Sequence, residues 1–156
     1  MNDRTSRFKA LEFLCANNLC TLSTIGVNYP ESSLLYYVVE DKHYLYMITT
    51  KQSRKINNLL NNNKISLVVY SENPPLELQI EGDAERVDDQ EKKEHIAKIY
   101  LEMASKNPET KNWPPVIKLP NTEGFEFIKI TIHKFKYSDF RTPDYFIVEG
   151  TPLDWN

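Results

Sequence analysis

A short run of hydroxyl-bearing and cationic residues in the first half of the chain has the composition of an anion-binding site. The run follows an apolar stretch typical of a strand and reads Thr49-Thr50-Lys51-Gln52-Ser53-Arg54-Lys55. Hydroxyl groups donate hydrogen bonds to phosphate oxygens, and the bonds from arginine and lysine are charge-assisted. The chemistry that this run could do is therefore the binding of a phosphate group.

The charge of the run is unusual for the helix that it begins. The sequence predicts a short helix from about Ser53 to Leu60. Helix N-termini favour acidic residues, because free amides and the macrodipole leave about half a positive charge there. This first turn has Arg54 and Lys55 and no acid. A bound anion would remove the mismatch, with Thr49 and Thr50 as further donors. The local pattern equally allows a solvated basic turn with Ser53 or Thr50 as its N-cap.

Composition narrows the classes of ligand and partner. The chain has 156 residues and only four glycines, none of them near another. Dinucleotide-binding loops and ATP/GTP loops need closely spaced glycines, so both are excluded. The net charge of −3 gives no general electrostatic case for binding nucleic acid or an anionic membrane. We therefore expect side chains and a helix end to hold any phosphate ligand.

Cysteine and histidine positions predict neither a disulfide framework nor a metal site. Cys15 and Cys20 are typical of buried thiols in a reducing compartment. His43, His95 and His133 are scattered without metal-ligand spacing, and His133 alone stays open as an axial ligand should the fold bind haem. The N-terminal segment mixes charges into its apolar positions, unlike a signal peptide or a spanning segment. We expect a soluble cytoplasmic protein.

The elements that must position the candidate site follow from hydrophobic periodicity. Two further helices are predicted, from about Asp3 to Asn17 and from Asp88 to Ser105. Gly82 lies inside a strand pattern and marks a bulge or a barrel bend. The predicted strands are Leu19 to Thr24, Ser32 to Val39, His43 to Thr50, Lys64 to Tyr70, Leu76 to Val87 and Phe125 to Tyr137.

These elements predict one mainly β domain over residues 1–156. Six strands joined by hairpin-length connections, with helices outside the strand run, favour an antiparallel sheet that closes on itself. A parallel doubly wound sheet would need helical crossovers between most strands. The expected architecture is a small six-stranded antiparallel β-barrel with peripheral helices.

With these residues in view, the sequence resembles the pyridoxamine 5′-phosphate oxidase-like FMN-binding split barrels. The resemblance rests on Thr49 to Lys55 after a strand, on Asn62 to Leu67, and on Glu81 to Val87. It covers roughly Leu19 to Val87 and matches the C-terminal half only in outline. It implies a six-stranded split β-barrel and a homodimer with FMN bound between the subunits.

The resemblance also implies roles for particular residues. Thr49, Ser53, Arg54 and Lys55 would hold the FMN phosphate, with Thr50 beside them. The strand Ser33-Leu34-Leu35-Tyr36 would run past the isoalloxazine ring and offer backbone groups to its polar edge. Ile48 would lie near the cofactor, and the residues at the ring would further include Glu77 and Trp113.

Departures from the family pattern concern the ring rather than the phosphate. The oxidases carry an arginine where Ser33 aligns, a lysine where Val38 aligns and a glutamine where Glu77 aligns. The chain also ends at Trp155-Asn156 without the oxidases' substrate-binding tryptophan and arginine. These changes argue against vitamin B6 oxidation as the reaction and leave FMN binding intact. Trp113 has two interpretations, a plug at the barrel end or a cap on the flavin of the partner subunit.

The leading functional hypothesis is an FMN-dependent oxidoreductase acting on a small-molecule substrate, with an electron donor such as NADH or NADPH. Because the flavin performs the electron transfer, no acid–base constellation is required of the protein. The alternative is a carrier or sensor that binds a flavin or a tetrapyrrole without turnover. A third hypothesis is a relative that uses deazaflavin or haem. No metal, nucleic-acid or membrane partner is expected.

Overall fold

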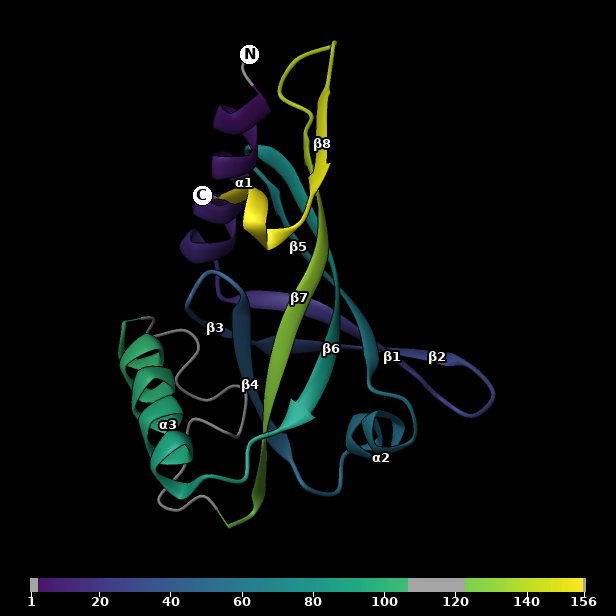
Figure 1. The fold of residues 1–156 in the computed structure, drawn as a ribbon, viewed down its shortest axis with the longest axis vertical. Helices are drawn as coiled ribbons and strands as arrows, with labels where there is room; N and C mark the ends of the chain where they lie inside the picture. Colours follow the sequence, from purple (N-terminus) through teal and green to yellow (C-terminus); the bar gives the residue numbers. More distant parts are fainter. Residues whose placement is uncertain (1–2, 107–122, 156) are drawn as a thin grey trace.

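The computed structural model describes residues 3–106 and 123–155, which form a mainly antiparallel β structure with three α-helices (Figure 1). The helices are α1 (Asp3–Ala16), α2 (Arg54–Asn61) and α3 (Gln90–Ser105), with a 3-10 turn, η3 (Pro152–Trp155), near the C-terminus. The strands are β1 (Leu19–Ile25), β2 (Pro30–Tyr36), β3 (Val38–Glu40), β4 (Tyr44–Thr50), β5 (Lys64–Glu72), β6 (Pro75–Arg86), β7 (Phe125–Asp139) and β8 (Phe146–Gly150).

The sheet curls back on itself because its first and last strands are joined by one residue. The strand order is β2-β1-β5-β6-β7-β4-β3, with β8 added beside β7. Tyr37 separates β2 from β3, so the two ends of this order are neighbours along the chain. The Tyr37 amide donates to the carbonyl of Asn18 over 2.8 Å. Its hydroxyl donates to the carbonyl of Leu14, also over 2.8 Å. Tyr37 therefore fixes the seam of the half-barrel.

The predicted antiparallel, mainly β architecture is confirmed, and the predicted strand number is wrong. Eight strands are present within the described residues, two more than expected. The predicted strand from Ser32 to Val39 is divided at Tyr37, because its two halves pair with different partners, β1 and β4. The C-terminal tail adds β8, which pairs with the second half of β7.

The bulge expected at Gly82 is present, and its extra residue lies on the opposite strand. The register between β6 and β7 shifts at Glu81/Gly82, where Glu81 faces Lys134 and Gly82 faces Ile132. His133 is the unpaired residue, and both it and Lys134 are exposed. The bulge changes the phase of β7 so that buried residues on both sides of it face the same core, namely Ile130, Ile132, Phe135 and Tyr137.

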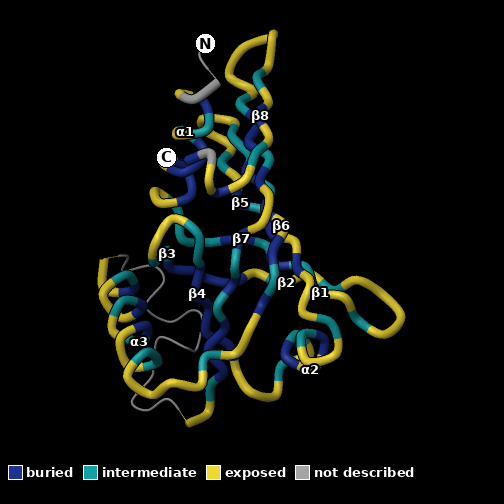
Figure 2. The backbone as a smooth tube through the Cα atoms, in the orientation of Figure 1, coloured by how far each residue is buried: buried dark blue, intermediate teal, exposed yellow. Residues whose placement is uncertain are grey.

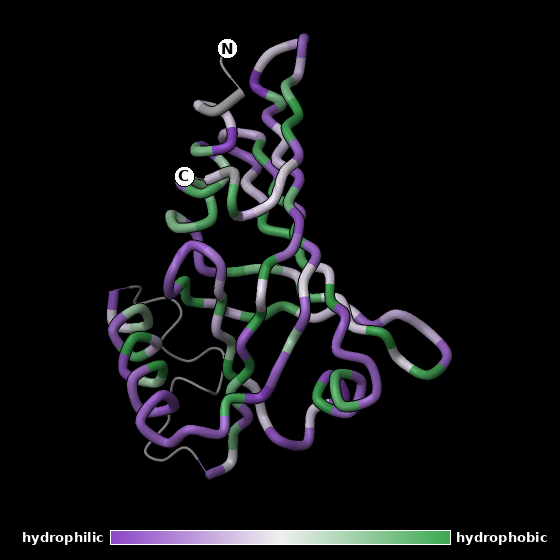
Figure 3. Tube along the Cα trace, viewed as in Figure 1, coloured by the Kyte–Doolittle hydropathy of each residue, from purple (hydrophilic) through white to green (hydrophobic). Residues whose placement is uncertain are grey.

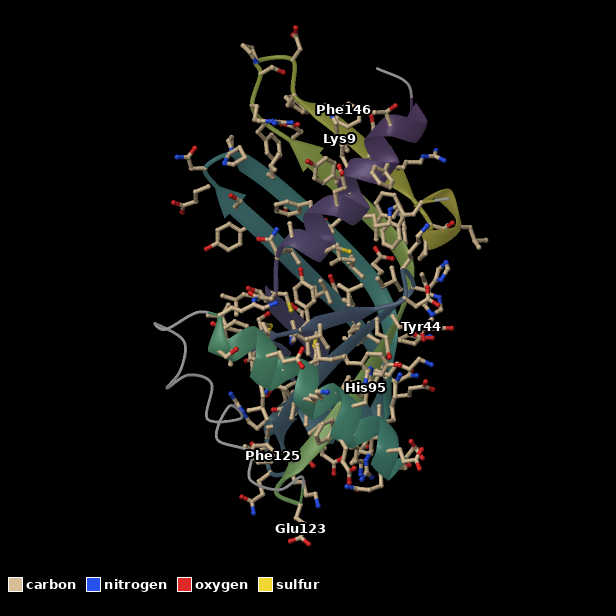
Figure 4. The ribbon with its side chains drawn as sticks, turned by 90° about the vertical axis from the view of Figure 1, so that its left-hand side faces the viewer. Lys9, Tyr44, His95, Glu123, Phe125 and Phe146 are labelled. Carbon is tan, nitrogen blue, oxygen red and sulfur yellow. The ribbon has the colours of Figure 1, made fainter. Side chains whose placement is uncertain are left out.

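Two hydrophobic cores pack against the sheet, one inside the half-barrel and one under α3. Figure 2 shows in dark blue the buried positions along the strands and helices. The larger one fills the half-barrel and is covered by α1 and the C-terminal turn, where Trp155 stacks on Phe135 with ring centroids 4.9 Å apart. The smaller one lies under α3, where Ile96 and Tyr100 pack against Ile48. Figure 4 shows α3 crossing the outside of the sheet, with His95 labelled on it. Of the helices in the described ranges, none has both the length and the apolar character needed to span a bilayer.

Replacing Gly82 by alanine tests the close approach at the bulge. A Cβ at this position would lie 2.4 Å from the backbone oxygen of Thr131, which cannot move without disturbing β7. We expect Gly82→Ala to lower the free energy of unfolding by about 1–3 kcal/mol. Urea denaturation followed by circular dichroism measures the change. Gly124→Ala is the matched control, because a Cβ there meets no described atom within 4 Å. Equal stability of the two variants would contradict this account of Gly82.

Candidate functional site

The loop between β4 and α2 presents the residues that the sequence predicts to bind phosphate. We call the run from Thr49 to Lys55 the phosphate loop, after that prediction. Thr50, at the end of β4, is exposed, and its carbonyl accepts from the amide of Ser53 over 3.1 Å, which makes the turn into the helix. The Lys51 amide donates to the carbonyl of Gly124 over 3.2 Å. This hydrogen bond fastens the loop to Gly124, which directly precedes β7 and is distant from the loop in sequence.

Three of the predicted donors converge at the first turn of α2. Lys55 Nζ donates to Thr49 Oγ1 over 3.3 Å, and Thr49 Oγ1 lies 3.4 Å from Ser53 Oγ. Thr49 is buried, with 4% of its surface exposed, so its hydroxyl is held in place. Ser53 is the N-cap residue, yet its side chain makes no capping hydrogen bond. Its hydroxyl therefore keeps the capacity to bind a ligand oxygen.

The ammonium of Lys55 is partly withdrawn from water. Burial lowers the pKa of Lys55, the nearby Arg54 lowers it further, and the Glu31 carboxylate opposes both effects by raising it. A half-buried cation beside a second cation is stabilised by an anion at short distance. The electrostatics of this turn thus favour a negatively charged group next to Thr49 and Ser53.

Glu31 on β2 supplies an acid that the first turn of α2 lacks in its own sequence. Its Oε1 lies 3.4 Å from Arg54 Nη1, and its Oε2 accepts from Asn58 Nδ2 over 3.2 Å. The same Asn58 nitrogen is 3.0 Å from Thr24 Oγ1. Neither a bound anion nor a plain solvated turn describes this arrangement fully, because a carboxylate from the β1–β2 hairpin already pairs with one of the cations.

Sequence reasoning missed Glu31 and Asn58 because their roles depend on tertiary pairing. The register of β1 with β2 places Glu31 opposite Thr24, and α2 docks on that pair. Asn58 is 8% exposed, although its residue type and its place in the run Asn57-Asn58 give no sign of burial. The only sequence signal is helical periodicity, which puts Asn58 one turn after Arg54.

The residues predicted to contact the flavin ring have different environments. Ser33 is half-buried and Leu34 is exposed. Leu35 belongs to the core of the half-barrel, while Tyr36 is buried in the core under α3. Ile48 is also buried under α3, with 1% of its surface exposed, directly before Thr49. Ile48 therefore anchors the start of the phosphate loop in the core under α3.

The edge of β2 presents backbone groups in the way the ring prediction requires. The bond from the Tyr37 amide to Asn18 makes Tyr36↔Leu19 a non-hydrogen-bonded pair, and Leu34↔Thr21 is the next such pair in the alternation. The amide and carbonyl of both Leu34 and Tyr36 consequently point away from β1. The carbonyl of Tyr36 accepts from the Tyr100 hydroxyl over 2.5 Å. Leu34 is thus the residue of this strand best placed to offer backbone groups at the edge.

The structure places Glu77 at the end of β6 that lies away from α2 (Figure 1). Glu77 lies near the start of β6 and accepts from Gln79 Nε2 over 2.9 Å. Asp83, further along β6, pairs with Lys64 just beyond α2, and Glu77 precedes Asp83 by six positions, which is about 20 Å along the strand. Trp113 lies outside the described residues.

The three histidines lie apart from one another, each beside a different acidic residue. His95 Nε2 lies 3.1 Å from Glu40 Oε1, and His133 Nε2 lies 3.0 Å from Asp83 Oδ2, so both take part in surface ion pairs when protonated. No group of three or more histidine, cysteine, aspartate or glutamate side chains within residues 3–106 and 123–155 is placed to hold a metal ion. Both cysteines are free thiols; Cys20 is buried as predicted, whereas Cys15 is exposed and the prediction of burial is wrong for it.

Comparison with protein families gives one match that covers most of the chain. The family described as pyridoxamine 5′-phosphate oxidase matches residues 8–139, a span that contains the phosphate loop, the β2 edge and Glu77. Among curated protein sequences no significant match was found.

Solved structures share the fold at low sequence identity. A Clostridium acetobutylicum protein related to general stress protein 26 of Bacillus subtilis, of the pyridoxinephosphate oxidase family, has a TM-score of 0.72 and 17% identity, over 98% of this chain and 99% of its own. An FAD-binding protein from Mesorhizobium loti has a TM-score of 0.64 and 20% identity, over 83% and 91% of the chains. A haem-binding protein from Mycobacterium smegmatis has a TM-score of 0.68 and 15% identity, over 96% and 59%. At these identities the likeness establishes the split-barrel fold.

Substituting Asn58 tests how α2 is held on the hairpin. Asn58→Ala removes the donor shared by Thr24 and Glu31, and we expect it to lower the free energy of unfolding by about 1–3 kcal/mol because the buried Thr24 hydroxyl and the half-buried Glu31 carboxylate lose their partner. Asn57→Ala on the exposed face of the same helix is the control. Urea denaturation of both variants measures the difference, and an unchanged midpoint for Asn58→Ala would refute the role of this side chain.

Proposed function

The chain belongs to the pyridoxamine 5′-phosphate oxidase family, and we propose that within it the protein binds FMN and acts as a flavin-dependent oxidoreductase. The observation that carries this proposal is the convergence of three side chains at the start of α2, where Thr49 Oγ1 lies 3.3 Å from Lys55 Nζ and 3.4 Å from Ser53 Oγ. Hydroxyls and a half-buried cation at a helix N-terminus are the donor set that a terminal phosphate requires.

In this proposal the donors fit the phosphate group by chemistry and by position. The Ser53 hydroxyl is not used for capping, and Thr49 is immobilised by burial. Lys55 contributes the charge, since binding a dianion beside it offsets the burial that lowers its pKa. Arg54 lies at the exposed side of the same turn and would close over the phosphate from solvent.

The β2 edge supports a place for the isoalloxazine ring. Leu34 would offer its backbone groups to the polar edge of the ring, while Ser33 would lie beside it. Bound FMN would supply one-electron or hydride chemistry, and the protein would supply orientation and electrostatics. Tyr36 and Ile48, both buried under α3, would keep this edge and the phosphate loop in a fixed relation.

The proposal includes a homodimer with the flavin between its subunits. Glu77 lies about 20 Å along β6 from Asp83, whose partner Lys64 follows α2, so in this proposal a ring contact by Glu77 would come from a second chain. The β1–β2 hairpin carries exposed apolar side chains, among them Val27 with 93% and Tyr29 with 78% of the surface exposed. The tube of this hairpin includes hydrophobic stretches, coloured green in Figure 3. Exposed apolar residues of this size are typical of a surface that a partner covers.

The reaction we propose is not the oxidation of vitamin B6. Ser33, Val38 and Glu77 stand where the family's oxidases carry arginine, lysine and glutamine. Without two cations beside the ring, the anionic reduced flavin loses stabilisation, and Val38 is instead buried in the core under α3. We propose a small-molecule substrate of another class and NADH or NADPH as donor. The two free thiols fit the cytoplasm, the location we propose.

A second candidate function is haem or flavin binding without turnover, favoured by the haem-binding neighbour from Mycobacterium smegmatis. His133 would be the candidate axial ligand, and it is ion-paired with Asp83 on the outer surface of the sheet. The absorption spectrum of the purified protein separates the candidates. A Soret band would favour haem, whereas flavin bands that bleach with NADPH under anaerobic conditions would support the oxidoreductase.

Flavin affinity tests the phosphate loop directly. We expect the protein to bind FMN and to gain thermal stability from it. Lys55→Ala should weaken FMN binding by roughly ten- to hundredfold, the value of a charge-assisted hydrogen bond, and Arg54→Ala should weaken it less because this side chain is exposed. Isothermal titration with FMN gives the affinities.

Two controls make the result specific. Lys98→Ala removes an exposed lysine of α3 and should leave the affinity for FMN unchanged. Riboflavin, which lacks the phosphate, should bind Lys55→Ala and the wild-type protein equally. A loss of affinity that is the same for riboflavin and FMN would show that the loop does not bind the phosphate.

A further inference from the structure

We infer that Glu31 determines the affinity of the phosphate loop, by holding Arg54 in an ion pair that a phosphate ligand must break. The inference rests on the proposed function for the identity of the ligand and goes beyond it in naming an internal competitor. The competing group is a carboxylate on β2, a strand separated in sequence from the loop. Its effect is to lower the affinity for phosphate esters while leaving uncharged ligands unaffected.

The position of Glu31 is fixed on two sides. Its carboxylate accepts from Asn58 Nδ2 over 3.2 Å, and that nitrogen is bound to Thr24 in turn. On the hairpin side, a Cβ at Gly26 would lie 3.5 Å from Glu31 Cγ and 3.6 Å from Oε1, so the side chain runs directly past the glycine. Glu31 therefore presents a carboxylate of fixed position to the helix.

Arg54 is the more exposed member of the pair. Its side chain is 85% exposed, whereas that of Glu31 is 29% exposed, and the two groups are 3.4 Å apart. A pair this exposed has a small net free energy, about 0–1 kcal/mol, so a stronger anion can displace it. A phosphate bound to Thr49 and Ser53 would draw Arg54 away from Glu31, because a dianion attracts the guanidinium more strongly than one carboxylate does.

Glu31 opposes phosphate binding in two ways. Breaking the pair with Arg54 consumes part of the binding free energy, and the carboxylate then remains near the phosphate as a like charge. The charge of Glu31 also acts on Lys55, because it raises the pKa of Lys55 against the effect of burial. Both effects disappear when the carboxylate is replaced by an amide of the same shape.

The test compares Glu31→Gln with the wild-type protein. Glutamine keeps an oxygen that can accept from Asn58, and removes the charge. We expect the affinity for FMN to rise by roughly two- to tenfold, and the affinity for riboflavin to stay the same, as measured by isothermal titration. Glu149→Gln is the matched control. Glu149 lies on β8 and forms an exposed ion pair with Lys134 over 3.7 Å. The substitution breaks that pair and changes the net charge by the same amount as Glu31→Gln.

A double-mutant cycle separates competition for Arg54 from a general charge effect. In the Arg54→Ala background, Glu31→Gln should increase FMN affinity by a smaller factor than in the wild-type background. Glu31→Asp, which keeps the charge on a shorter side chain, should also tighten FMN binding if pairing with Arg54 is the main effect. It serves as the second variant should Glu31→Gln fail to fold by circular dichroism.

The outcomes also distinguish this inference from the proposed function. If FMN binds and Glu31→Gln leaves its affinity unchanged, or raises riboflavin affinity equally, the inference is overturned and FMN binding stands. If FMN does not bind, inorganic phosphate is the probe. Greater thermal stabilisation of Glu31→Gln than of wild type by phosphate would then support the inference while the FMN proposal fails. Equal stabilisation of both proteins would overturn it.

Discussion

The hydrogen bonds of two buried tyrosines close the half-barrel, and the candidate site depends on that closure. Tyr37 ties the junction of β2 and β3 to the end of α1 through its amide and hydroxyl. Tyr100 donates to the carbonyls of Tyr36 and Tyr46 over 2.5 and 3.1 Å, and so joins β2, β4 and α3. Burial raises the pKa of Tyr100 well above its ordinary value, which keeps the hydroxyl a donor. Because β4 leads into the phosphate loop, the hydrogen bonds of Tyr100 set the position of that loop relative to the β2 edge.

The phosphate loop combines a basic first turn with an acid from another strand. A helix that begins with cations is destabilised unless negative charge lies nearby, and Glu31 provides part of that charge in the absence of ligand. This ion pair offsets part of the destabilisation that a cation-rich first turn causes. Glu31 engages the exposed Arg54, whereas Lys55 donates to Thr49 within the loop.

Local signals in the sequence predicted most elements and the donor cluster, whereas features set by pairing between distant strands were missed. The long helix begins where expected, with Asp89 accepting from the Lys92 amide. The division at Tyr37 has no sequence signal, because the residues around it are uniformly apolar. β8 was missed because it is short and turn residues lie close to it. Glu31 could be found only from the register of β1 with β2. The bulge had a signal, since the apolar residues Ile132 and Phe135 are three positions apart where alternation requires two.

The bulge at His133 has a consequence for comparing this chain with distant relatives. Gly82 and the unpaired His133 form a point at which β7 can gain or lose one residue without reversing its buried and exposed faces. Anywhere else along Phe125–Asp139, a one-residue difference in length would turn Phe135 and Tyr137 out of the core or disturb pairing with β4. When sequences near 17% identity are aligned, a single-residue gap in this strand therefore belongs at His133.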